Sequence, residues 1–172
     1  MGAEKAASRL AELPEFANAR TVKVNPDSPQ RKVRELVTVH GKLLLMPAPR
    51  LRSGFLLLRP ERVKGKERLA SSIKGAFSLR EKMGLDKDLA PDVLVVGSVA
   101  VGRDESRIGK GEGYSEIVPP RRLPSHSSVT TRIAMAVAIA PPMSKYCSNG
   151  NATATPDGFT VNLTVEIVDQ PA

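Results

Sequence analysis

The spacing of hydrophobic and polar positions predicts a helix, a strand and a turn in the first part of the chain. Residues 4–13 have the spacing of a short amphipathic helix, and Pro14 ends it. Residues 21–24 alternate between polar and apolar side chains, as a strand does. Residues 25–29 are Asn, Pro, Asp, Ser and Pro, which favour a turn.

Short apolar runs and a charged stretch predict the next elements. Residues 36–39 and 42–46 are both rich in apolar side chains and are separated by a His-Gly pair, which predicts a β-hairpin. Residues 61–83 are charged and favour helix, with breaks at Gly65 and Gly75. The middle of the chain is therefore expected to contain both strands and helices.

The run 93–101 is apolar at nearly every position. A strand that is buried on both faces has this pattern, so the run predicts a central parallel strand. A strand, a charged helical section and a second strand, in this order, indicate an α/β sheet. We therefore expect an α/β domain over residues 1–117.

The sequence changes character beyond residue 117. Residues 119–128 are typical of a linker, and residues 148–158 are polar and of low complexity. Residues 159–167 alternate cleanly enough to predict one strand. We expect residues 118–172 to form a divergent, poorly structured tail that contains this strand.

The charge of the chain adds a class of partner. The net charge is +8, and residues 117–172 contribute only +1 of it, from four cations and three anions. A basic domain attracts phosphates of any kind, so the charge leaves nucleotide and RNA ligands both open. Aromatic side chains do not interleave with the basic ones, which argues against a stacking platform for single-stranded nucleic acid.

Cysteine content and apolar runs bear on the compartment. Cys147 is the only cysteine, so the sequence offers no intramolecular disulfide and no cysteine-based metal site. Glu4 and the lack of an apolar block near it exclude a secretory signal peptide. The longest apolar run, residues 133–140, is too short to span a bilayer. We expect a soluble intracellular protein without a membrane partner, cytoplasmic by default, with a plastid location left open.

One loop carries most of the candidate chemistry. The run Arg107-Ile-Gly-Lys-Gly-Glu-Gly-Tyr114 follows the apolar strand and has glycine at every second position, which lets backbone N–H groups converge on one point. With two cations, Arg107 and Lys110, the loop suits a phosphate chain. Its spacing matches neither the P-loop nor the dinucleotide fingerprint. A flexible basic surface loop is the alternative interpretation.

Longer stretches resemble a known family. Residues 92–102 and 107–114 resemble the part of the 5-formyltetrahydrofolate cyclo-ligase family in which a buried strand leads into the loop that holds ATP. They are most similar to its divergent branch, the methenyltetrahydrofolate-synthase-domain proteins. The resemblance includes residues 22–27 and 45–55 and covers about residues 10–117. It implies a three-layer α/β fold, ATP and Mg²⁺ as cofactors, and a formylated folate as substrate.

The resemblance also implies roles for single residues. In cyclo-ligases ATP activates the formyl oxygen of 5-formyltetrahydrofolate, and ring closure gives 5,10-methenyltetrahydrofolate. Lys110 and Arg107 are implied as catalytic cations that face the phosphates. The implied cofactor-binding residues are Arg107, Ile108, Gly109, Lys110, Gly111, Glu112, Gly113, Tyr114 and Ser115. Glu116 stands where the family has its Mg²⁺-binding Asp, and an exposed carboxylate at a helix N-terminus is an equal alternative.

Three departures from the family weaken the enzymatic prediction. The Pro-Pro pair after residue 118 limits any helix that follows the loop to about one turn. The family's basic N-terminal helix, which also contacts ATP, has no clear counterpart here, and Lys5 and Arg9 are the candidates for it. The family's folate-binding Glu, between a strand and a helix, has no match. In that general region Arg50 and Arg52 are candidates to bind a glutamate tail or a phosphate, or else belong to a solvated loop.

These observations lead to one predicted function and one alternative. We expect a truncated cyclo-ligase-like protein with an atypical tail, which binds ATP, Mg²⁺ and a folate-type molecule in one-carbon metabolism, with weak or no turnover. The alternative is a non-catalytic regulatory protein that binds a nucleotide or RNA. His40, His126 and Cys147 have no partner at motif spacing, so no catalytic role is expected for them.

Overall fold

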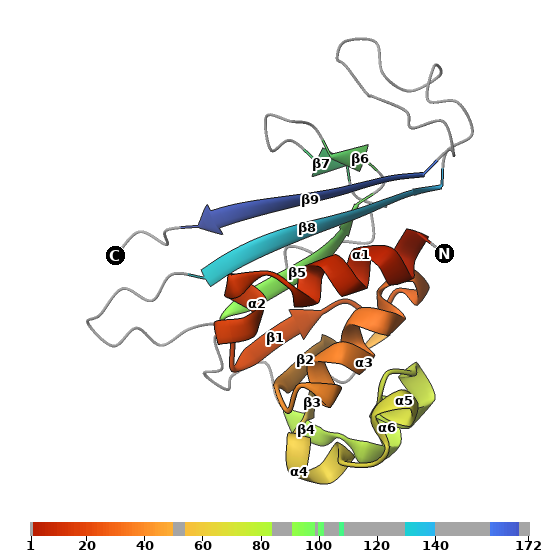
Figure 1. The fold of residues 1–172 in the computed structure, drawn as a ribbon. Helices are drawn as coiled ribbons and strands as arrows, with labels where there is room; N and C mark the ends of the chain where they lie inside the picture. Colours follow the sequence, from red (N-terminus) through yellow and green to blue (C-terminus); the bar gives the residue numbers. More distant parts are fainter. Residues whose placement is uncertain are drawn as a thin grey trace.

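The computed structural model describes residues 2–49, 54–83, 91–98, 100–101, 107–108, 130–139 and 159–168. Seven strands form one mixed sheet, in the order β4-β3-β2-β1-β5-β8-β9 (Figure 1). They are β1 (Thr21–Val24), β2 (Leu43–Pro47), β3 (Phe55–Leu58), β4 (Glu81–Met83), β5 (Val93–Ser98), β8 (Thr130–Ile139) and β9 (Phe159–Val168). A separate two-stranded ribbon consists of β6 (Ala100–Val101) and β7 (Arg107–Ile108).

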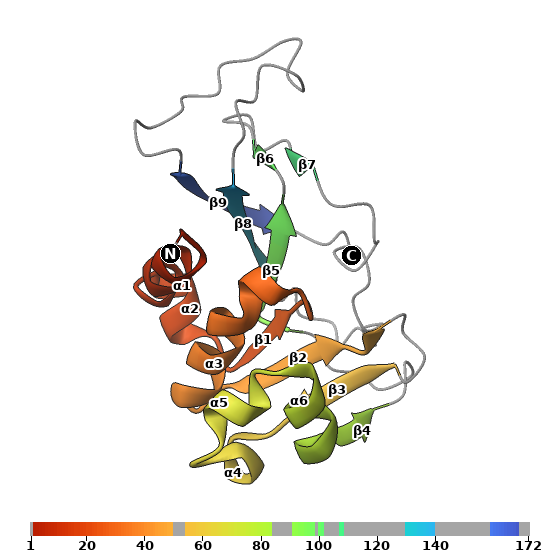
Figure 2. The same ribbon diagram turned by 90° about the vertical axis from the view of Figure 1, so that its right-hand side faces the viewer.

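Short helices pack against this sheet (Figure 2). They are α1 (Gly2–Ala11), α2 (Pro14–Asn18), α3 (Arg31–Val39), α4 (Pro60–Val63), α5 (Glu67–Ala70) and α6 (Ile73–Leu79), and the 3-10 turn η1 (Ser28–Gln30) leads into α3. The predicted α/β class is confirmed. Among the described residues, no helix is both long and apolar enough to cross a membrane.

The centre of the sheet is parallel. β1 pairs in parallel with β2 and with β5, and β5 pairs in parallel with β8. β3, β4 and β9 are antiparallel to their neighbours. The strand predicted at residues 93–101 therefore lies between two parallel strands, as expected, although β5 itself ends at Ser98.

The main hydrophobic core lies between the sheet and the helices. Its fully buried members include Val22, Val24, Val95, Leu10, Phe16, Val33 and Val37. Burying one Val, Leu or Phe side chain stabilises the fold by about 1.5–3 kcal/mol, so these contacts hold the helices on the sheet. A second cluster of Leu45, Phe55 and Leu57 comes from the intervening strand positions of β2 and β3, which point to the other face of the sheet.

Residues 36–39 are helical, so the predicted hairpin is wrong. Val33 and Val37 lie one turn apart on α3 and are both fully buried in the core. This packing outweighs the β propensity of the Val-rich run. The predicted turn is present, but it ends a helix: Gly41 has a φ of 67°, and the Lys42 N–H donates to the Val37 carbonyl at 3.0 Å.

The charged section 61–83 contains one of its two predicted breaks. Gly65, with a φ of 76°, separates α4 from α5 as predicted. Gly75 lies inside α6, so the break predicted there is wrong; Ser72 instead caps α6 by accepting a hydrogen bond from the Gly75 N–H at 3.0 Å. A Cβ at Gly75 would collide with the Leu69 carbonyl, so this glycine permits the close approach of α5 and α6.

Among the described residues, two strands follow residue 117, where one was predicted. β9 confirms the strand predicted at residues 159–167 and pairs antiparallel with β8. β8 lies within residues 118–172, at residues 130–139, where no strand was predicted. It pairs with β5 on one side and β9 on the other, so its backbone groups find partners in the main sheet.

Candidate functional site

The parallel strands β1 and β5 are neighbours, so their carboxyl ends lie at the same edge of the sheet. Asn25 directly follows β1, and Ser98 is the last residue of β5. In open α/β sheets, ligands bind outside the carboxyl ends of the strands. Gln30, at the end of η1, approaches β5 at Gly97. We call Asn25, Gln30 and Ser98 the polar cluster.

The side chains of the polar cluster are buried, and each has at least one polar atom without a hydrogen-bond partner among the described residues. Asn25, Gln30 and Ser98 are 2%, 1% and 8% exposed. Asn25 Oδ1, Ser98 Oγ and both polar atoms of Gln30, Nε2 and Oε1, make no hydrogen bond in the part of the chain that the structure describes. Leaving a buried polar group unpaired costs about 1–3 kcal/mol. This edge of the sheet therefore holds hydrogen-bonding capacity that the described residues leave unused.

Gln30 is fixed against β5 by backbone geometry. Its φ of −89° and ψ of 4° lie in the bridge region, where many active-site residues are found. A Cβ at Gly97 would lie 2.5 Å from Gln30 Nε2 and 3.6 Å from Asp27 Oδ2. Glycine at position 97 therefore makes room for the amide, and the half-buried carboxylate of Asp27 stands on the same side.

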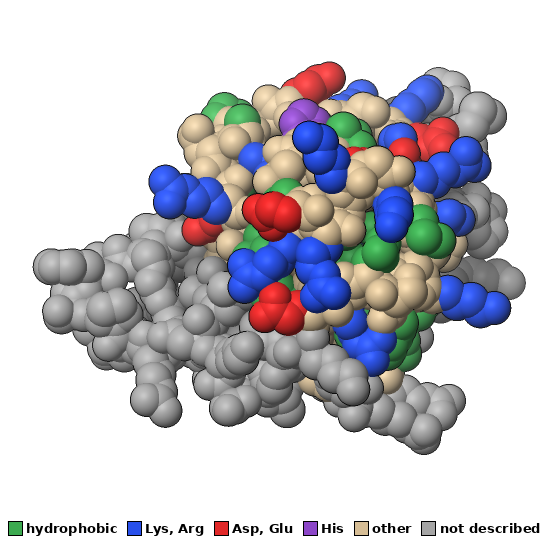
Figure 3. All heavy atoms as spheres, turned by 90° about the horizontal axis from the view of Figure 1, so that it is seen from below, with side chains coloured by type: hydrophobic (Ala, Val, Ile, Leu, Met, Phe, Trp, Pro, Cys, Tyr) green, Lys and Arg blue, Asp and Glu red, His purple; other side chains and the backbone are tan. Residues whose placement is uncertain are grey.

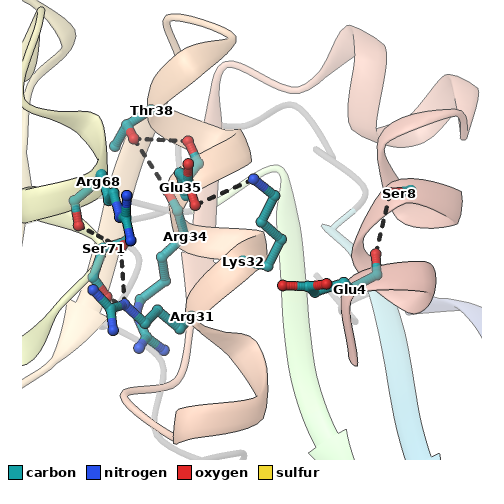
Figure 4. Close-up of polar contacts among 9 residues, drawn as sticks. All are labelled: Glu4, Ser8, Arg31, Lys32, Arg34, Glu35, Thr38, Arg68 and Ser71. Carbon is teal, nitrogen blue, oxygen red and sulfur yellow. Dashed lines mark hydrogen bonds and ion pairs between the residues drawn. The ribbon is translucent and has the colours of Figure 1, made fainter. Parts of the chain in front are cut away.

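Arg34 positions the loop that carries the polar cluster. Its Nη1 donates to the carbonyl oxygens of Asn25 at 2.6 Å and of Asp27 at 2.9 Å. Its Nε donates to the carbonyl oxygen of Ser71 at 2.8 Å, which ties the loop to the α5–α6 junction (Figure 4). Burial lowers the pKa of Arg34 to about 10, against an opposing effect of Asp27. The guanidinium therefore keeps its charge at neutral pH.

The glycine loop begins beside the same edge. β7 pairs antiparallel with β6 through Ile108↔Ala100 and Arg107↔Val101, and β6 begins two residues after Ser98. The backbone of Arg107 and Ile108 is thus held next to the chain that leaves β5. The side chains of these two residues lie outside the described part, as do Gly109, Lys110, Gly111, Glu112, Gly113, Tyr114, Ser115 and Glu116.

The other candidate residues are spread over the molecule. Lys5 and Arg9 are exposed on α1, which contacts η1. His40 follows α3 at the opposite end from Gln30, and its ring meets that of Phe16 edge-on at 5.8 Å. The described residues contain no group of three or more His, Cys, Asp or Glu that could hold a metal ion. The candidates outside the described ranges are Arg50, Arg52, His126 and Cys147.

Sequence reasoning missed the polar cluster and Arg34. A usable signal existed for Asn25, because it follows a predicted strand and the ends of neighbouring parallel strands meet. Ser98 lies inside the strand predicted over residues 93–101, and the structure shows that β5 ends there. Gln30 offered none, since its position depends on α3, which was predicted as part of a hairpin. Arg34 has the sequence signature of any helix-surface cation, and its burial is visible only in the fold.

Comparison with known proteins extends the sequence resemblance. The model of the 5-formyltetrahydrofolate cyclo-ligase family matches residues 1–140, which takes the match past residue 117 and through β8. A methenyltetrahydrofolate synthase domain-containing protein of Mus musculus is 44% identical over 119 residues, 67% of this chain and 32% of that protein. The Homo sapiens protein of the same name is 40% identical over 119 residues, 67% of this chain and 31% of that protein.

The match covers different shares of this chain and of its curated relatives. The matched part of this chain spans about a third of the length of these curated relatives. The family model, in contrast, covers most of the chain, from residue 1 to residue 140. This chain therefore belongs to the 5-formyltetrahydrofolate cyclo-ligase family.

Proposed function

We propose that this chain binds ATP with Mg²⁺ at the carboxyl edge of β1 and β5, through residues 107–115, and a folate-type molecule beside it. The observation that carries the proposal is the pairing of Ile108 with Ala100, which starts the glycine loop beside the chain that leaves β5 at Ser98. Membership in the cyclo-ligase family supports the choice of ATP, Mg²⁺ and folate.

Charged and neutral groups of the site would bind different parts of the ligands. Arg107 and Lys110 would face the phosphates together with the N–H groups of the glycines. Glu116 is the proposed Mg²⁺ ligand, because Mg²⁺ is usually held by one or two carboxylates and by substrate phosphates. The unpaired groups of the polar cluster fit a ligand at this edge, since they are buried and neutral. Bound ATP would supply the phosphoryl group that activates a formyl oxygen.

We expect turnover to be weak or absent. Phosphoryl transfer depends on holding the triphosphate, the metal and the second substrate in one geometry. The Pro-Pro pair after residue 118 limits a helix that would support the loop. The junction between β1 and α3 presents Asp27 and the neutral Gln30 rather than a glutamate. Nucleotide binding is therefore the part of the activity that this chain is best equipped to keep.

Thermal unfolding tests the nucleotide proposal. ATP with millimolar Mg²⁺ should raise the thermal midpoint of the 172-residue chain, because a ligand that binds only the folded state stabilises it. Lys110→Ala should lose most of this increase. Lys74→Ala, which changes an exposed lysine of α6, is the matched control and should keep it. An unchanged midpoint of the wild-type chain at saturating ATP would refute the proposal.

A second candidate function, RNA binding without catalysis, is favoured by the surface of α4–α6. From Arg59 to Arg80, both included, the sequence has seven Lys or Arg residues and two Glu. Arg59 pairs with Glu81 at 2.7 Å, and the exposed members of the segment without a described ion pair are Arg62, Lys64, Lys66, Arg68 and Lys74. Figure 3 shows blue side chains spread over the face at the α4 end of the molecule. Such cations can neutralise backbone phosphates.

A further inference from the structure

We propose that Gln30 recognises a planar nitrogen heterocycle, through a hydrogen-bond donor and an acceptor that stand side by side on the edge of its ring. The inference deepens the function proposed above and rests on it for the place of the ligand. It assigns a specificity-determining role to a residue that lies on η1, outside the glycine loop.

The side-chain amide of Gln30 has two polar groups that the fold leaves unused. Gln30 is 1% exposed, and neither Nε2 nor Oε1 has a hydrogen-bond partner among the described residues. A carboxamide offers a donor and an acceptor in one plane about the width of one base edge apart, which is why Gln and Asn pair in bidentate fashion with adenine. A ring edge of this kind would satisfy both groups at once.

The surroundings of Gln30 favour a neutral ligand group over an anion. Asp27 Oδ2 stands on the same side of Gly97 as the amide. Asn25 Oδ1 is a second buried oxygen that can only accept. An anionic oxygen placed here would face these acceptors, whereas an amino group or a ring N–H would donate to them. The phosphates are therefore expected on the glycine loop and the heterocycle at Gln30.

The amide is also held in place before any ligand arrives. Gln30 is the N-cap residue of α3, and its Nε2 occupies the space that a side chain at position 97 would take. Arg34 donates hydrogen bonds to the carbonyl oxygens of Asn25 and Asp27, at the start of the turn that leads to Gln30. A group fixed in this way loses little conformational entropy on binding, which strengthens its contribution to affinity.

Two bound molecules present such an edge, the adenine of ATP and the pterin ring of a folate. Titration calorimetry with four probes separates them: ATP against inorganic tripolyphosphate, and 5-formyltetrahydrofolate against p-aminobenzoylglutamate. Gln30→Met keeps the length of the side chain and removes both polar groups. We expect the Gln30→Met variant to bind one of the two heterocyclic probes about tenfold or more weakly than wild type does, since each hydrogen bond contributes about 1 kcal/mol. The two probes without the ring should bind it as they bind wild type.

Unfolding without ligand supplies a second, independent readout. Because the removed groups are unpaired, Gln30→Met and Ser98→Ala should leave the thermal midpoint equal to or above that of wild type. Ser71→Ala is the matched control, since Ser71 Oγ is fully buried but donates to the Arg68 carbonyl at 2.8 Å. This control should lower the midpoint by a few degrees.

The possible outcomes are distinguishable. Unchanged binding of both heterocyclic probes by Gln30→Met overturns the inference, as does a midpoint that falls as far as in Ser71→Ala, which would indicate a structural role. A wild-type chain that binds 5-formyltetrahydrofolate through Gln30 but binds neither ATP nor tripolyphosphate refutes the nucleotide proposal and leaves Gln30 as the reader of the ring. A wild-type chain that binds none of the four probes refutes both.

Discussion

Two buried cations among the described residues, Lys42 and Arg34, donate hydrogen bonds to backbone carbonyls. Lys42 is 8% exposed, and its Nζ donates to the carbonyl oxygens of Ala17 and Ala19 at 2.8 Å each. Arg34 is 2% exposed and has three carbonyl acceptors. Charged groups are satisfied in this way because an unpaired buried charge is far more costly than an unpaired amide. The neutral side chain of Gln30, unlike these two cations, has no hydrogen-bond partner among the described residues. We therefore assign it a role in binding a ligand rather than in stabilising the fold.

Replacing Arg34 should cost both stability and ligand binding. Arg34→Met leaves the carbonyl oxygens of Asn25, Asp27 and Ser71 without this donor, so we expect the free energy of unfolding to fall by about 2–4 kcal/mol. Arg31→Met, which removes one weak 3.4 Å contact of an exposed side chain with Ser71 Oγ, should change it by less than about 0.5 kcal/mol. Urea unfolding measures both values. Equal values for the two variants would contradict the anchoring role of Arg34.

At the scale of elements, the sequence predicted a helix or strand correctly where its pattern was compatible with a single kind of structure. β1, β5, β9 and α1 were predicted because alternation, a continuous apolar run and helical spacing are distinct signals. The run 36–39 was misread because its β-branched residues fit a strand locally, and only the packing of Val33 and Val37 makes it a helix. β3 and β8 were not predicted. β8 pairs with β5, a partner distant in the chain that a local pattern does not reveal, whereas β3 pairs with β2, the strand that precedes it.

Two valines of α3 distinguish the helix from the predicted hairpin. Val37 and Val39 would share one face of a strand, but on α3 Val37 is fully buried and Val39 is 58% exposed. Val37→Ala should therefore lower the free energy of unfolding by about 2 kcal/mol. Val39→Ala should leave it unchanged or raise it slightly, because Ala has the higher helix propensity. Chemical denaturation measures the difference, and similar losses for both variants would contradict the helix.

At the scale of the whole molecule, charge and chemistry lie in different places. The candidate ligand site is at the carboxyl edge of β1 and β5, where the polar cluster is neutral. The basic surface belongs to α4–α6, the section around Arg59 to Arg80, whose helices follow β3. The polar cluster and the basic surface therefore need not bind the same ligand. Each can be tested while the other is left intact.

RNA binding, if present, should depend on the α4–α6 surface. The double variant Lys64→Gln with Lys66→Gln should weaken binding to a double-stranded RNA and reduce the slope of log affinity against log salt by roughly 1.5, since each lost phosphate contact removes about 0.7–0.9. Lys5→Gln with Arg9→Gln changes two exposed cations of α1 and should leave the slope unchanged. Filter binding at several salt concentrations measures both. Equal slopes for the two double variants would exclude this surface.

Catalytic turnover requires all parts of the site to be positioned together. We predict that the purified 172-residue chain gives no ATP-dependent formation of the methenyl chromophore from 5-formyltetrahydrofolate above a Lys110→Ala control. The physical reason is positional: an error of about 1 Å in a bound substrate can cost on the order of a hundredfold in rate. Absorbance of the methenyl product measures the reaction. Robust conversion by the wild-type chain would show that a working cyclo-ligase site is present.

The contact of α1 with β8 and β9 has a consequence for synthesis on the ribosome. Residues 2–11 leave the ribosome well before the strands at residues 130–139 and 159–168 that they contact. A ten-residue helix is marginal in water on its own, and its contacts with β8 and β9 form only after both strands have been made. The packing of α1 against these strands is therefore a late step in the folding of this sheet, and until then the helix remains open to a chaperone.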